Sequence, residues 1–201
     1  MEPNPFVYPR TPHARKHGPY GYKKYQHYRQ WLRDEFSFRC VFCLYREQWP
    51  STQTWEIEHL LPKSQCREKE CEYDNLLYVC RSCNANNRLT IVPDPCRIAL
   101  GNCLQVHSDG SITALSGEGR VLIAVLRLDN AAYRRMRQLI LDILESLFRN
   151  DRRLFLALMC YPQDLPDLAN VKPQPTGNTK PAGLKNSFYA LRARGELPET
   201  Y

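Results

Sequence analysis

Four cysteines in two matched pairs are the first residues of this chain that could bind a metal. Cys40 and Cys43 form one Cys-x-x-Cys pair, and Cys80 and Cys83 form the other. Two such pairs can place four thiolates at the corners of a tetrahedron, the geometry that zinc prefers in structural sites. Four protein ligands leave no open position, so the predicted zinc is structural rather than catalytic. Four ordinary buried cysteines are the weaker interpretation, because two matched motifs rarely coincide by chance.

Five further cysteines lie outside this pattern: Cys66, Cys71, Cys96, Cys103 and Cys160. A second metal site from the first four of these is conceivable, but none has the two-residue spacing, so we expect free or buried thiols. The N-terminus has no basic start followed by an apolar stretch, and no run of about 18 apolar residues exists. We therefore expect a cytoplasmic chain with no membrane span, in which thiols stay reduced and favour metal over disulfides.

Between the two pairs lies a carboxylate next to a histidine, Glu58 and His59. Hydrolysis of a phosphodiester needs an activated water and a metal that neutralises charge on the phosphate. Histidine is the side chain best suited to take a proton near neutral pH, and a carboxylate is a hard oxygen ligand for a magnesium-like ion. Adjacent residues of a strand point to opposite faces, so the two can serve one site only if the backbone turns there.

The order of these motifs resembles the HNH, or ββα-metal, nuclease family with a zinc-binding cysteine tetrad. The resemblance covers roughly residues 38–90 and is carried by Glu58-His59, Pro62-Lys63-Ser64, Asn75-Leu76 and Cys80-x-x-Cys83-Asn84. It implies an α+β fold in which a ββα-metal nuclease core is held together by zinc. It also implies activity that depends on Mg²⁺ or Mn²⁺. We expect DNA, in double-stranded form, as the substrate.

The resemblance assigns roles residue by residue. His59 matches the general base, and Glu58 matches the acidic ligand of the catalytic metal. Asn75 matches the middle residue of the motif, which braces the loop and orients the base. Asn84 matches the metal ligand on the helix. One turn further on, Arg88 matches a position where a basic, phosphate-binding or metal-binding group often lies, and Asn87 is a weaker candidate from the same turn.

Two features depart from the family pattern. Glu58 stands where aspartate is commoner, and the segment from His59 to Asn75 has Cys66 and Cys71 in place of the usual glycine pair. A weaker resemblance, carried by Ile57-Glu58-His59 and Pro62-Lys63-Ser64, points to HNH proteins of bacterial anti-phage (antiviral) defence. These often work beside an ATPase, which would be a partner of this chain.

The elements that position the motifs can be predicted from periodicity. We expect a basic helix over 22–36 with an apolar stripe, a hairpin over 103–115 turning at Ser108-Asp109-Gly110, and a helix over 130–148 with Asp129 as N-cap. A short helix over 152–160, a Pro-rich coil over 162–181 and a short helix over 184–194 complete the chain. The predicted regions are a basic arm and helix (1–37), a nuclease core (38–92), a hairpin and helical accessory region (93–161) and a tail (162–201).

Most of the net charge of +7 lies in the arm and first helix. Its basic residues are Arg10, Arg15, Lys16, Lys23, Lys24, Arg29, Arg33 and Arg39. A solvated basic face is one interpretation, and phosphate contacts are the sharper one. For function, two alternatives to a nuclease stay open. One is a zinc-dependent nucleic-acid-binding module without catalysis, and the other is a nuclease subunit that is active only with a partner.

Overall fold

The computed structural model describes residues 4–49, 54–86 and 90–201. Its elements, in chain order, are β1 (Pro19–Tyr20), η1 (Tyr25–Tyr28), α1 (Arg29–Glu35), β2 (Trp55–His59), η2 (Arg67–Lys69), η3 (Tyr73–Asn75), β3 (Leu76–Cys80), α2 (Arg81–Asn86), η4 (Leu100–Asn102), β4 (Leu104–Val106), β5 (Ile112–Ala114), α3 (Gly117–Leu126), α4 (Ala131–Asn150), α5 (Arg152–Met159), β6 (Gly177–Asn178), η5 (Pro181–Asn186) and α6 (Phe188–Ala193). The chain is therefore α+β, as expected. No helix within these ranges is long and apolar enough to cross a membrane.

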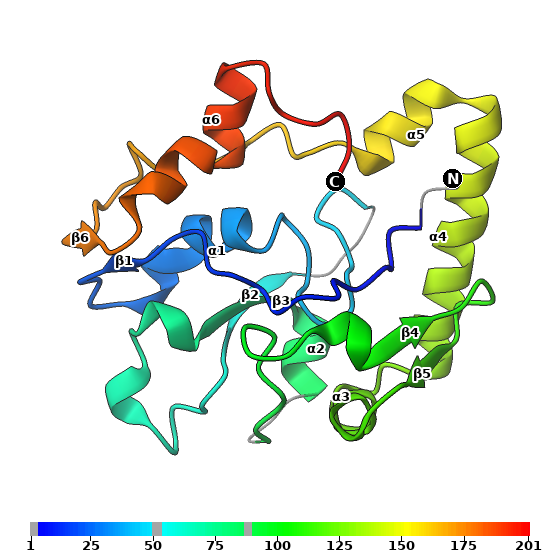
Figure 1. The fold of residues 1–201 in the computed structure, drawn as a ribbon, viewed down its shortest axis with the longest axis horizontal. Helices are drawn as coiled ribbons and strands as arrows, with labels where there is room; N and C mark the ends of the chain where they lie inside the picture. Colours follow the sequence, from blue (N-terminus) through cyan, green and yellow to red (C-terminus); the bar gives the residue numbers. More distant parts are fainter. Residues whose placement is uncertain (1–3, 50–53, 87–89) are drawn as a thin grey trace.

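The centre of the molecule is the antiparallel pair β2–β3, followed directly by α2. Trp55 pairs with Cys80 and His59 with Leu76, so the ladder is regular from one end of β2 to the other. All five residues of β3 are buried. Figure 1 shows this unit in the middle of the molecule, with α4 along the right edge and the C-terminal segment crossing the top from α5 to β6. The β2–β3–α2 order is a hairpin followed by a helix.

The N-terminal arm is part of the folded body. Phe6 and Tyr8 are buried in the main core, and Pro19 of β1 pairs with Asn178 of β6. His17 is fully buried, and its Nε2 atom lies 2.8 Å from Oδ1 of Asp34 in α1. The arm and the Pro-rich tail thus lie together against α1, although they are far apart in the sequence.

The predicted basic helix is shorter than its apolar pattern. It consists of η1 and α1, and Phe36 follows as the C-cap, while the expected stripe residues Tyr28, Leu32 and Phe36 are buried. The prediction of a solvated basic face is wrong for Arg33, which is 8% exposed and pairs with Glu47 at 2.8 Å.

The hairpin is confirmed as β4 and β5, which pair Leu104 with Ala114. Gly110 in its turn has φ +76°, and a Cβ there would lie 2.3 Å from the backbone oxygen of Arg134 in α4. Only glycine therefore fits both the turn and the close approach of α4. The sequence patterns did not predict α3, whose N-cap is Ser116.

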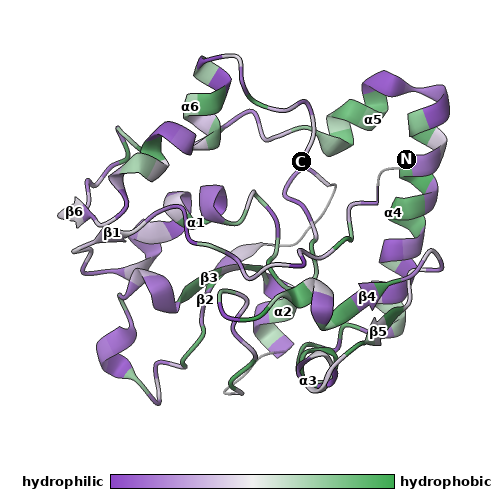
Figure 2. Cartoon of the chain, in the orientation of Figure 1, coloured by the Kyte–Doolittle hydropathy of each residue, from purple (hydrophilic) through white to green (hydrophobic). Residues whose placement is uncertain are grey.

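The long helix is confirmed as α4, with two corrections. Its N-cap is Asn130, whose side chain accepts from the amide of Tyr133, and not Asp129. Arg137 is buried and Ile143 is 43% exposed, against the usual preference of arginine for the surface and of isoleucine for the core. Figure 2 shows alternating hydrophilic and hydrophobic stripes on α4 and α5, as their amphipathic sequences require. Helices α5 and α6 lie where the sequence predicted short helices.

Candidate metal centre and catalytic residues

The four predicted zinc ligands meet in the core. The Sγ atoms of Cys40, Cys43, Cys80 and Cys83 all lie within 4.8 Å of one another, and all four residues are buried. The Sγ atoms of Cys43 and Cys80 are 3.7 Å apart. A tetrahedral zinc with Zn–S bonds of about 2.3 Å requires sulfur–sulfur distances of roughly 3.8 Å. The cluster can therefore hold a metal such as zinc.

Local structure explains why the thiols converge. In the first pair, the amide of Leu44 donates to the carbonyl of Cys40 at 2.9 Å, and Leu44 has a positive φ of 60° that closes the loop. In the second pair, Cys80 ends β3 and Cys83 lies in the first turn of α2. The amide of Val41 donates to the carbonyl of Tyr78 at 3.1 Å, which fastens the first loop to β3.

Helix α4 supplies the outer contacts of the cluster. The Tyr133 hydroxyl lies 3.4 Å from Sγ of Cys83 and can donate to a thiolate there. Arg137, one turn later, is buried, and its Nε donates to the carbonyl of Gly110. Hydrogen bonds from Cys40, Cys43 and Cys83 lower the pKa of Cys80, so the cluster already favours one thiolate. Such contacts orient the ligands of a metal and are part of the site.

The four remaining candidates for a second metal do not converge. Among the residues that the structure describes, the tetrad is the one group of histidine, cysteine and acidic side chains with metal-binding geometry. Cys103 is buried, while Cys66, Cys71 and Cys96 are partly exposed. The expectation of free or buried thiols is confirmed for these four.

His59 lies at the end of β2 and is 6% exposed. Its Nε2 atom is 3.0 Å from the carbonyl oxygen of Glu70, and its ring packs edge-on against Tyr25 at 4.7 Å. A carbonyl can only accept, so Nε2 carries the proton and Nδ1 keeps the lone pair. Burial, aided by the charge of Lys63, lowers the pKa of His59 from its usual value, despite the hydrogen bond to Glu70. The imidazole is therefore neutral near pH 7 and can accept a proton.

Asn75 fastens the segment that holds His59. Its Oδ1 accepts from the amide of Leu61 at 2.8 Å, and its Nδ2 donates to the carbonyls of Leu61 and Lys69 at 3.2 and 3.1 Å. Lys69 precedes Glu70, whose carbonyl orients the imidazole. The bracing contacts that the resemblance implies for Asn75 are thus present.

Glu58 and His59 lie on opposite faces of the β2–β3 ladder. Their neighbours across the ladder are Leu77 and Leu76, with no irregularity between them, and alternation directs successive side chains to opposite faces. The backbone turn that would bring both to one side is absent from this strand. His59 shares its face with Trp55, which stacks on Tyr78 at 5.2 Å.

The other face of β2 looks toward α2 and carries a residue that sequence reasoning missed. Glu56 accepts a hydrogen bond from Nδ2 of Asn84, and Glu58 follows two residues later on the same face. Carboxylate and amide oxygens are the types of ligand that Mg²⁺ and Mn²⁺ prefer. The alternation of Glu56 with Glu58 was the available signal. Asn87 and Arg88 lie outside the described residues.

Much of the basic segment is engaged within the protein. Both terminal nitrogens of the Arg29 guanidinium donate to the carbonyl of Trp55 at the start of β2. Arg15 donates to the carbonyl of Leu76 at 2.7 Å, and Lys16 pairs with Asp34 at 3.0 Å. The basic residues of this segment that are exposed are Arg10, Lys23 and Lys24. A phosphate-binding surface on this segment would rest on those side chains.

No protein-family model matches the chain, and comparison with curated proteins finds no similar sequence.

Proposed function

We propose that this protein is a divalent-metal-dependent endonuclease that hydrolyses phosphodiester bonds in DNA, with His59 as the general base. The observation that carries the proposal is the imidazole itself. It is neutral, its Nε2 is committed to the Glu70 carbonyl, and its Nδ1 is left as a proton acceptor. The hairpin-then-helix order and the cysteine tetrad around it are the features that the HNH resemblance implies.

In this mechanism Nδ1 of His59 takes a proton from water, and the resulting hydroxide attacks phosphorus. The bond from phosphorus to the leaving oxygen then breaks, and that oxygen departs with the electron pair. Asn75 acts indirectly, because it holds the segment whose carbonyl orients the imidazole. Glu58 and Asn84 would hold Mg²⁺ or Mn²⁺, which stabilises negative charge on the phosphate.

Plasmid cleavage with Mg²⁺ or Mn²⁺, with and without EDTA, tests the proposal directly. We expect His59→Ala to reduce the cleavage rate by at least about 100-fold, the usual contribution of a general base. His107→Ala is the matched control, because His107 lies on the β4–β5 hairpin and contacts Thr113. Melting curves and DNA titrations of both variants separate catalysis from folding and binding. Comparable cleavage rates for His59→Ala and wild type would contradict the assignment of His59 as the general base.

One observation favours a second candidate, a nucleic-acid-binding module that is stabilised by zinc and has no catalytic activity. The regular ladder directs Glu58 and His59 to opposite faces, so a metal held by Glu58 does not face the imidazole across one pocket. In that case DNA binding survives His59→Ala, and the wild type cleaves no plasmid with any divalent metal.

The weaker resemblance supports a role in bacterial anti-phage defence beside an ATPase. A partner-dependent nuclease would be silent alone and active in the complex. Helix α4 is the candidate docking element, since Leu139 and Ile143 on it are 40% and 43% exposed. Cleavage assays with and without the co-purified ATPase distinguish this form of the proposal from an independent nuclease.

A further inference from the structure

Two arginines lie directly opposite each other at the base of the loop that carries Cys40 and Cys43, called here the first cysteine loop. Arg39 and Arg46 form an antiparallel bridge, so their side chains leave the same side of the backbone pair. Arg46 is 2% exposed and Arg39 is partly buried. Two like charges in this position repel each other, and burial removes the water that would screen them.

Neither guanidinium has an acidic partner among the ion pairs of residues 4–49, 54–86 and 90–201. Nη1 of Arg46 donates to the carbonyl of Met159 at 3.3 Å, and its Nε is buried without a hydrogen-bond partner. Its guanidinium lies 4.2 Å from the centre of the Tyr201 ring. The C-terminal end of α5 offsets only about half a charge.

Both side chains remain cationic at neutral pH. Burial, with a further contribution from the charge of Arg39, lowers the pKa of Arg46 to about 10, although Tyr201 opposes the shift. A buried charge without a counter-charge costs several kcal/mol. By contrast, the nearby Arg33 is matched by Glu47 and Asp164 at 2.8 and 3.0 Å. The Arg39–Arg46 pair therefore has no matched carboxylate among the residues that the structure describes.

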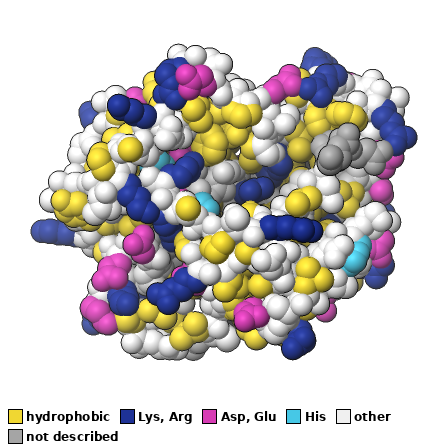
Figure 3. Space-filling model, viewed as in Figure 1, with side chains coloured by type: hydrophobic (Ala, Val, Ile, Leu, Met, Phe, Trp, Pro, Cys, Tyr) yellow, Lys and Arg dark blue, Asp and Glu magenta, His cyan; other side chains and the backbone are white. Residues whose placement is uncertain are grey.

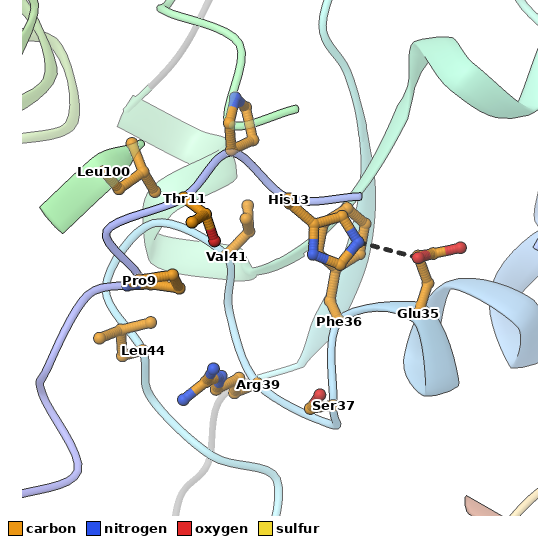
Figure 4. Close-up of a pocket in the computed structure, with 11 residues that line it drawn as sticks. Pro9, Thr11, His13, Glu35, Phe36, Ser37, Arg39, Val41, Leu44 and Leu100 are labelled. Carbon is orange, nitrogen blue, oxygen red and sulfur yellow. Dashed lines mark hydrogen bonds and ion pairs between the residues drawn. The ribbon is translucent and has the colours of Figure 1, made fainter. Parts of the chain in front are cut away.

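Arg39 lines a small cavity between the N-terminal arm and the first cysteine loop (Figure 4). It lies beside Pro9 and Leu44, while His13 turns away from it toward Glu35. Glu35, the acidic residue that lines the same cavity, forms no ion pair with Arg39 among the described residues, and its Oε1 accepts from His13 and from the amide of Lys16, each at 2.8 Å. In the space-filling view the middle of this face is hollowed and has basic side chains in the hollow (Figure 3).

We propose that Arg39 and Arg46 bind a phosphate group. Guanidinium groups bind phosphate oxygens in a bidentate manner, and a phosphate monoester carries about the two negative charges that this pair lacks. The phosphate belongs either to a free small molecule, a monoester with about two negative charges, or to the backbone of a nucleic acid, where each diester carries one. Guanidinium groups recognise the phosphate oxygens in the same way in both. The inference does not depend on nuclease activity.

Thermal unfolding of the full chain in sodium phosphate, against sodium chloride of equal ionic strength, tests the proposal. We expect phosphate at about 100 times its Kd to raise the Tm of wild type by roughly 5 °C or more. This gain is lost in Arg39→Gln and in Arg46→Met, and is kept in Arg97→Gln, whose side chain is 87% exposed. If Arg46→Met does not fold, Arg39→Gln, a partly exposed position, carries the test.

A second measurement assigns the source of the phosphate. If the site takes a DNA phosphate, Arg39→Gln weakens duplex binding at least about tenfold, and inorganic phosphate competes with the duplex. If the site takes a free molecule, Arg39→Gln binds duplex as tightly as wild type does, but phosphate no longer raises the Tm of the variant. No gain of Tm in wild type, or an equal gain in wild type and Arg39→Gln, overturns the proposal.

Discussion

At the residue scale, the amide of Asn84 shows how one contact can decide what a side chain offers a metal. Glu56 accepts from Nδ2, so the oxygen of the same amide points the other way. An amide binds a cation only through its oxygen, and the carboxylate of Glu56 fixes that orientation. In the proposed metal site, Glu56 would be a positioning residue, because it would act through Asn84.

This arrangement predicts that Glu56→Gln weakens the binding of Mn²⁺ by about tenfold, the usual cost of losing a contact behind a metal ligand. Titration calorimetry with Mn²⁺ on the zinc-loaded protein measures the effect without requiring cleavage. Glu68→Gln is the control, because Glu68 lies in η2 and bonds to Cys66. Equal Mn²⁺ affinities for Glu56→Gln and wild type would contradict the positioning role.

Glu35 is a buried carboxylate whose ionisation links the stability of the fold to pH. Burial alone would raise its pKa, but hydrogen bonds from His13 and the Lys16 amide, with the charge of Arg15, lower it to about 2. A depressed pKa in the folded state stabilises the protein above the unfolded value of 4.5. That contribution, on the order of 3 kcal/mol, is lost as the pH falls from about 4.5 toward 2.

We therefore expect Glu35→Gln to lower the free energy of unfolding at pH 7, and the difference from wild type to shrink between about pH 5 and pH 3. Urea unfolding of both proteins at a series of pH values gives this difference. Any metal that the tetrad loses in acid is lost from both proteins, so this loss cancels in the difference between their free energies of unfolding. A difference that stays constant with pH would show that Glu35 acts through packing. The groups around its carboxylate are Arg15, His13, Lys16, His17, Asp34 and Tyr73.

At the scale of elements, periodicity predicted what depends on local sequence and missed what depends on distant contacts. The β4–β5 hairpin and α5 have strong local signals, a turn glycine and an amphipathic repeat. The tetrad converged as its two-residue spacings predicted. The burial of Arg137 could not be predicted, because its partner, the carbonyl of Gly110, comes from a hairpin 27 residues away.

The candidate catalytic site shows the same division. Asn75 braces the His59 segment as expected, but the partner of Asn84 is Glu56, which no motif singled out. The opposite faces of Glu58 and His59 follow from a ladder whose regularity the sequence did not reveal. Register depends on pairing with β3, and therefore on residues that the motif does not include.

The cysteine tetrad joins three elements, the first loop, the end of β3 and α2, so the metal should contribute directly to folding. We expect purified protein to contain one zinc per chain, and Cys43→Ala to lose it together with several kcal/mol of stability. Cys66→Ala is the matched control, because Cys66 is partly exposed and outside the tetrad. Metal analysis and thermal melts provide both measurements. A zinc-free Cys43→Ala protein that melts like wild type would show that the tetrad does not stabilise the fold.

At the scale of the whole molecule, the net charge of +7 is not the same as an available binding surface. Arg29 and Arg33 are committed to Trp55 and Glu47, so their removal would perturb β2 and the core as well as any phosphate contact. Lys23 and Lys24 are exposed and precede η1, whose Tyr25 packs on His59. They are the basic side chains of this segment best placed for a DNA strand at the imidazole.

We therefore expect Lys23→Ala with Lys24→Ala to weaken duplex binding and to reduce the slope of log K against log salt by about 2. Each phosphate contact releases about one counterion when DNA binds, so the loss of two contacts lowers the slope by about 2. Such contacts carry no base information, so the loss should be the same for unrelated sequences. Arg153→Ala with Lys185→Ala removes the same charge from exposed positions on α5 and η5 and should change the slope little. Titrations at three or more salt concentrations decide the matter. If both double variants lower affinity equally, the basic charge acts as a general field, and the surface beside His59 has no special part in holding DNA.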